Sequence, residues 1–137
     1  MRIKRRILLI NDREDEIILR MFLIKKWISE SKNDKPYLIS LFKALNSNEA
    51  FNTLISNGFE FDLIITDLER GDDDPIKFIQ FCKEFFPDIK VLVLSYHSEK
   101  NLLELGQDAD FALSAAESYE TTVAVLDHLL FNRPLNI

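Results

Sequence analysis

Two aspartates in this sequence stand directly after apolar runs. Asp67 follows residues 63–66, and Asp12 follows residues 7–11. Strands buried on both faces read as continuous apolar runs, and open parallel sheets bind ligands just beyond the carboxyl ends of their strands. We therefore predict that the two carboxylates meet in one site. Each aspartate alone also fits a simpler role as a turn former or a helix cap.

A pair of carboxylates in one crevice predicts a divalent cation, with Mg²⁺ as the natural partner. This ion prefers oxygen ligands in octahedral geometry and keeps several waters. Two carboxylates and one backbone carbonyl would therefore suffice as the share of the protein. Without a cation, the acids would repel each other and the pKa of one carboxyl would rise.

The length and composition of the chain limit the classes of protein to which it can belong. The chain has 137 residues, 47% of them apolar, which fits one domain. Its net charge of -6 opposes binding to nucleic acid. No apolar stretch approaches the roughly 20 residues of a membrane span, and the run of about four apolar residues after the basic start is too short for an export signal. We expect a cytoplasmic protein that binds neither nucleic acid nor membrane.

Soft metal ligands and nucleophiles are scarce. Cys82 is the only cysteine, so an internal disulfide is excluded, and His97 and His128 are the only histidines. These residues do not form the spacing of a zinc or iron–sulfur site. Cys82 lies among phenylalanines at helical spacing, which favours a packing role over nucleophilic chemistry.

The elements that must position the acids alternate along the chain. Apolar runs alternate with helical patterns, as is typical of strand–helix units around a parallel sheet. We predict an α/β fold with strands at 6–11, 37–44, 62–66, 90–95 and 109–113. The helical patterns lie at 14–31, from 47 to just before Gly58, and at 75–86, 98–105 and 117–131. Asp74 is a candidate N-cap with Pro75 at the first helical position, and the mixed polarity of 37–44 indicates an edge strand.

The order of these motifs resembles the receiver domain of two-component response regulators. Four segments carry the resemblance, at residues 7–12, 61–67, 91–95 and 106–111. It spans nearly the whole chain, so it implies a single receiver-like domain over 1–137 without an output domain. It also implies a doubly wound, flavodoxin-like sheet with strand order 2-1-3-4-5 and five helices. In that order the first and third strands are neighbours at the topological switch point, which brings both carboxylates together.

The resemblance implies a role for each acid. Asp67 would be the phospho-acceptor that attacks a phosphohistidine on a sensor histidine kinase or phosphotransfer protein, with Mg²⁺ shielding the charge. Asp12 would be a direct metal ligand together with Asp67, and the backbone carbonyl of Glu69 would be another. Asn11 stands where the family usually has a further acid, and its amide oxygen can still reach the metal through water.

Two further positions match the residues that respond to phosphorylation in this family. Ser95 ends the fourth strand where the family places the hydroxyl that moves toward the phosphoryl oxygens, and Phe111 matches the switch aromatic. Both also have ordinary explanations, as a serine at a strand end and a phenylalanine in a half-buried strand.

The clearest departure lies at the end of the fifth strand. The family normally has Lys-Pro there, and this chain has Ser114-Ala115. Losing a charge-assisted hydrogen bond to the phosphoryl group typically costs on the order of 1.5 to 3 kcal/mol. The loop after Asp67 also departs, because Arg70-Gly71 replaces the common Met-Pro and Pro75 takes a usual glycine position.

Three functional hypotheses follow. The first is a stand-alone receiver that accepts phosphate on Asp67 and signals through contacts with a downstream protein. The second is a phosphorylation-independent pseudo-receiver that acts as a protein-binding adaptor. The third is a phosphatase with Asp67 as nucleophile, which is disfavoured because such hydrolases usually have a second aspartate where this chain has Glu69. We therefore expect no enzyme, and a homodimer through the last helices stays open.

Overall fold

The structure is a computed structural model, and it describes residues 3–31, 37–68, 74–96 and 107–135. Its elements alternate as predicted for an α/β fold. The strands are β1 (Ile3–Ile10), β2 (Tyr37–Ala44), β3 (Leu63–Thr66), β4 (Lys90–Ser95) and β5 (Phe111–Ser114). The helices are α1 (Glu14–Ser31), α2 (Ser47–Ser56), α3 (Pro75–Phe85) and α5 (Tyr119–Phe131).

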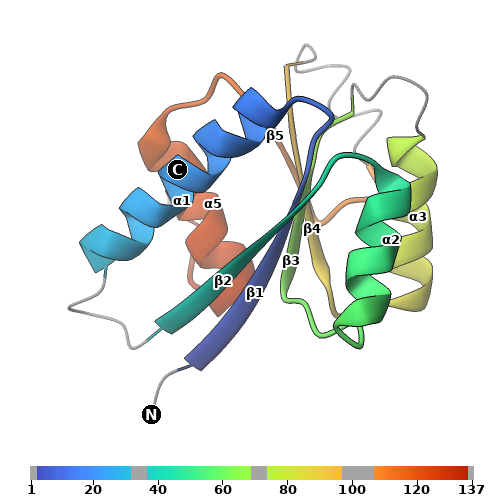
Figure 1. Cartoon of the computed structure of the whole chain (residues 1–137). Coiled ribbons are helices and arrows are strands. Elements are labelled where there is room, and N and C mark those ends of the chain that lie inside the picture. The colour runs from blue at the N-terminus through green and yellow to red at the C-terminus, as the bar shows by residue number, and fades with distance from the viewer. Residues whose placement is uncertain (1–2, 32–36, 69–73, 97–106, 136–137) are drawn as a thin grey trace.

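The five strands form one parallel sheet in the order β2-β1-β3-β4-β5, which confirms the predicted fold class, strand order and edge position of β2. Helices α1 and α5 cover one face, and α2 and α3 cover the other (Figure 1). The described part of the chain contains four of the five predicted helices. The remaining prediction, a helix over 98–105, lies outside the described residues.

Three strands differ from their predicted bounds. β3 begins at Leu63 rather than at residue 62. β1 begins at Ile3 rather than at residue 6, because its ladder with β2 starts there, with Ile3 opposite Tyr37. β5 begins at Phe111 rather than at residue 109. Before it, the Asp110 backbone N–H still donates to the Val91 carbonyl at 2.9 Å. The Val91 backbone N–H, however, donates to the Asp110 carboxylate (2.7 Å), which also accepts from Lys83 Nζ (2.7 Å).

Side-chain caps fix the helix starts. The Asp74 carboxylate accepts a hydrogen bond from the Lys77 backbone N–H at 3.1 Å, with Pro75 at the first turn, as predicted. α2 begins at Ser47, where the helical pattern begins, and its N-cap is Asn46, whose side-chain oxygen accepts from the Glu49 backbone N–H at 2.8 Å. A side-chain acceptor at this position satisfies a backbone donor that the helix itself leaves unpaired.

The sheet separates two cores. The face under α2 and α3 is rich in aromatic residues and includes Cys82, whereas the face under α1 and α5 is mainly aliphatic around Trp27. Cys82 is fully buried, and burial raises the pKa of its thiol to about 12. A neutral, enclosed thiol confirms the packing role. Leu126 and Leu130 of the last helix are likewise core residues. None of the described helices is long and apolar enough to cross a membrane.

Candidate functional site

The pairing of β1 with β3 brings Asn11 and Asp67 together, whereas Asp12 does not line the pocket that they share. Ile10 is registered with Thr66, so Asn11 and Asp67 are the next residues on adjacent strands, which lie about 4.8 Å apart in a sheet. Both side chains are buried, with exposed fractions of 9% for Asn11 and 5% for Asp67. They line one small pocket together with Thr66 and Arg20. Asp12 follows directly and is exposed.

Asn11 is held in place by its neighbours. Its backbone N–H donates to the Ala44 carbonyl at 3.1 Å, which extends the β1–β2 ladder by one bond. Its side-chain oxygen accepts a hydrogen bond from the Arg13 backbone N–H at 2.9 Å. An amide oxygen has a second lone pair, so this contact leaves the oxygen able to accept from a metal-bound water.

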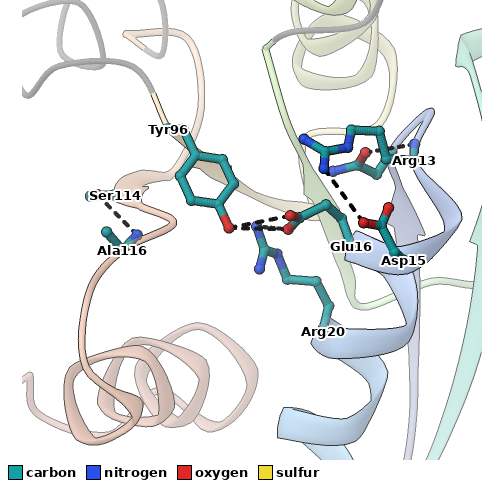
Figure 2. Close-up of polar contacts among 8 residues, drawn as sticks. Arg13, Asp15, Glu16, Arg20, Tyr96, Ser114 and Ala116 are labelled. Atoms are coloured by element: carbon teal, nitrogen blue, oxygen red, sulfur yellow. Dashed lines mark hydrogen bonds and ion pairs between the residues drawn. The ribbon is translucent and has the colours of Figure 1, made fainter.

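The ends of β4 and β5 form the other side of this edge. Ser95 is buried and is registered with Ser114, and the Ser95 carbonyl accepts from the Ala115 backbone N–H at 2.7 Å. The Ser114 hydroxyl accepts a hydrogen bond from the Ala116 backbone N–H at 3.1 Å (Figure 2). The residue at the usual lysine position therefore organises its own loop.

Phe111 lies at the opposite end of β5 from Ser114. It is half-buried, is registered with Leu92 and packs against the core under α1 and α5. Packing against this core is sufficient to explain a phenylalanine at this position. Its movement as a switch stays a prediction.

Sequence reasoning missed a polar cluster that joins α1 to the end of β4. Tyr96 extends toward α1 and its hydroxyl donates to the Glu16 carboxylate at 3.2 and 3.3 Å (Figure 2). Arg20 Nη2 lies 3.3 Å from Glu16 Oε2, and the guanidinium carbon lies 5.9 Å from the Tyr96 ring centroid. Glu16 and Arg20 are spaced four residues apart on a helix, a signal that the sequence did contain. Nothing in the sequence pointed to Tyr96.

This Glu16–Arg20–Tyr96 cluster lies beside the candidate site. The side chains of Glu16 and Arg20 are only 9% and 13% exposed, so the ion pair is screened little by water. Arg20 lines the same pocket as Asn11 and Asp67. Among the described residues that line this pocket, Arg20 is the only one with a guanidinium, and it is already paired with a carboxylate.

The chemistry of the donors suits a hard cation. Asp12 and Asp67 offer carboxylate oxygens and Asn11 offers an amide oxygen, a set that favours Mg²⁺ over softer metals. Within the described ranges, no group of three or more His, Cys, Asp and Glu side chains is placed to hold a metal ion. Glu69, whose carbonyl the resemblance implies as a ligand, lies outside the described residues.

Comparison with known proteins was informative at the level of structure. No protein-family model and no curated protein matches the sequence. Among solved structures, a two-component response regulator from Clostridium difficile is 20% identical, with a TM-score of 0.73 over 92% of this chain and 95% of that one. The signal receiver domain of a LuxO repressor protein from Vibrio parahaemolyticus is 19% identical, with a TM-score of 0.74 over 95% and 92%.

A third similar structure is the response regulator TrrA from Thermotoga maritima, solved in complex with Mg²⁺-BeF. It is 21% identical to this chain, with a TM-score of 0.70 over 92% of this chain and 99% of that one. Likeness at this level of identity establishes the fold. The chain has the fold of response regulator receiver domains, as the four sequence segments predicted.

Proposed function

We propose that this protein is a receiver that accepts a phosphoryl group on Asp67 from a sensor histidine kinase or phosphotransfer protein, and then signals through contacts with another protein. The observation that carries this proposal is the burial of Asp67 beside Asn11 at the carboxyl edge of a receiver-type sheet. A carboxylate at a strand end, on a pocket that it shares with another oxygen donor, can act as a nucleophile toward phosphorus when a cation offsets its charge.

The transfer itself is simple to balance. A carboxylate oxygen of Asp67 attacks the phosphorus of a phosphohistidine, the P–N bond breaks, and its electron pair stays on the imidazole. The product is an acyl phosphate. When bound, Mg²⁺ would neutralise negative charge on the carboxylate and the phosphoryl group.

The oxygen donors described above would hold this ion. Asp12, Asp67 and the Glu69 carbonyl would be direct ligands, and Asn11 would reach it through water. The complex of TrrA with Mg²⁺-BeF supports this choice of metal.

The ends of β4 and β5 favour a second candidate function. Ser114 replaces the usual lysine, its hydroxyl is engaged with Ala116, and the sequence holds no lysine after Lys100. A modification shifts a two-state equilibrium only by its differential interaction with the two states. Without the cation, the fold would serve as a binding module that contacts its partner regardless of phosphorylation.

Beryllofluoride with Mg²⁺, a mimic of the phosphoryl group, separates the two functions. In amide NMR spectra, we expect shifts at Asp67 and Ser95 on adding the mimic, and no such shifts in Asp67→Asn. Asp88→Asn is the matched control, because it removes the same charge from an exposed residue in the turn before β4. Unchanged spectra from a folded wild-type sample would reject phosphorylation and favour the binding module.

A further inference from the structure

The outer face of α1 carries an apolar patch formed by Ile18, Leu19 and Phe22. Their exposed fractions are 64%, 59% and 71%, whereas Ile17 and Ile24 on the opposite side of the helix are buried. A helix that covers a core normally presents polar residues on its outer face. Clustered exposed apolar side chains of this kind mark an interaction surface.

Charged residues of opposite sign flank this patch along the helix. Asp15 lies one turn before it and Lys25 one turn after it, and both are exposed. The positions 15, 18, 22 and 25 follow a spacing of three and four residues, which places them on one stripe of the helix. From its start to its end, the stripe therefore consists of an acidic residue, two apolar residues and a basic residue.

This stripe is complementary to itself when reversed. A two-fold axis that sets Asp15 opposite Lys25 of a second copy also sets Ile18 opposite Phe22 of that copy. Parallel pairing would instead set Asp15 against Asp15. Isologous two-fold interfaces are the commonest kind in homo-oligomers, and they require this self-complementarity.

We propose that α1 is a homodimerisation surface, on which a second copy of this chain docks with its own α1 antiparallel. The competing ion pair of Asp15 with Arg13 is exposed on both sides, so it opposes the contact only weakly. A contact made by one helix pair lies below the about 1,200 Å² of stable interfaces, so the dimer is a weak one that responds to concentration. Because α1 begins directly beyond Asp12, the contact also lies next to the candidate site.

Sedimentation velocity of the full chain over a range of concentrations tests the apolar part of this contact. We expect a concentration-dependent dimer in the wild type and at least about tenfold weaker association in Phe22→Glu, because a charge on the stripe would be buried without a partner. Ile55→Glu is the matched control, since Ile55 on α2 is 62% exposed. A monomeric wild type, or equal effects of the two variants, would overturn the proposal.

Exchange of the flanking charges tests the antiparallel arrangement. Asp15→Lys alone and Lys25→Asp alone each place like charges opposite one another in the dimer, so each variant should associate more weakly than the wild type. An equimolar mixture of the two variants restores both opposite-sign pairs and should recover association as a heterodimer. Damage to the helix cannot produce such recovery. A mixture that stays as weak as its components would contradict a second copy as the occupant.

Discussion

The carboxyl edge of the sheet has two unlike halves. At the ends of β1 and β3, which we call the acceptor half, Asn11 and Asp67 are buried together and Asp12 follows directly. At the ends of β4 and β5, which we call the response half, Ser95 is buried beside Ser114, and the position of the usual lysine holds a short neutral hydroxyl. The acceptor half holds the oxygen donors that we propose for a metal and a phosphoryl group, and the response half has a serine where the receiver family usually has a lysine.

If the proposed function holds, accepting a phosphoryl group and responding to it would depend on separate parts of one edge. Under the proposed function, nucleophilic attack would need a carboxylate and a cation to offset its charge, and the acceptor half contains the carboxylate of Asp67 and the oxygen donors proposed for the cation. A change of conformation needs groups that bind the phosphorylated state better than the free state. The Glu16–Arg20–Tyr96 cluster connects the halves, because Tyr96 follows β4 while Glu16 and Arg20 belong to α1.

The largest effect should come from breaking this connection at its charged pair. Arg20→Met leaves the nearly buried Glu16 carboxylate without its cation, and we expect the free energy of unfolding to fall by about 2 kcal/mol. Urea denaturation measures this change. Arg13→Met is the matched control, because the Arg13–Asp15 pair is exposed and should contribute almost nothing. Equal losses in both variants would show that the cluster does not stabilise the fold.

Restoring the cation should make the two halves alike. In Ser114→Lys we expect beryllofluoride to bind about tenfold more tightly in the presence of Mg²⁺, because a charge-assisted hydrogen bond to the mimic is regained. Titration monitored by amide NMR measures the affinity. Ala116→Lys adds the same charge two residues along the loop and should not reproduce the gain. If neither variant changes the affinity, the end of β5 does not face the bound group.

Strengthening the acceptor half should have a smaller effect. Asn11→Asp supplies the acid that the receiver family usually has at this position, and we expect about fivefold tighter binding of Mg²⁺, since affinity rises with the number of ligand charges. Isothermal titration of Mg²⁺ measures it. Asn48→Asp makes the same change on the exposed side of α2 and serves as control. Equal affinities in all three proteins would place the metal away from Asn11.

The smallest effect should come from the neutral member of the connecting cluster. Tyr96→Phe removes the hydroxyl that donates to Glu16, and because Tyr96 is 57% exposed we expect a loss of about 0.5 kcal/mol in the free energy of unfolding. Combining it with Arg20→Met completes a double-mutant cycle. Strict additivity of the two losses would indicate that the three side chains do not act as one unit.

Much of the fold was readable from local patterns. Alternating apolar runs and helical periodicity predicted the α/β class and the five strands, and the Asp74-Pro75 pair predicted the start of α3. The misplaced start of β5 shows the limit of such patterns. The pattern predicted a start at residue 109, but the Asp110 carboxylate takes the Val91 backbone N–H and Lys83 Nζ, and these partners are distant in sequence.

The candidate site divides in the same way. The position of Asp67 at a strand end and the serine in place of the usual lysine at position 114 were evident from the sequence and its resemblance to receivers. The sequence did not predict that Asn11, Asp67 and Arg20 line one pocket. It also did not predict that Tyr96 contacts Glu16. These contacts join segments that are tens of residues apart.

The sequence by itself determined which residues could carry chemistry and which strands would be buried, because both depend on side-chain type and on short-range periodicity. Only the tertiary structure decided which charges meet. Strand register placed Asn11 beside Asp67 and Ser95 beside Ser114, and helix packing brought Tyr96 to Glu16. Such pairings depend on the register and packing of the whole sheet, which no local pattern encodes.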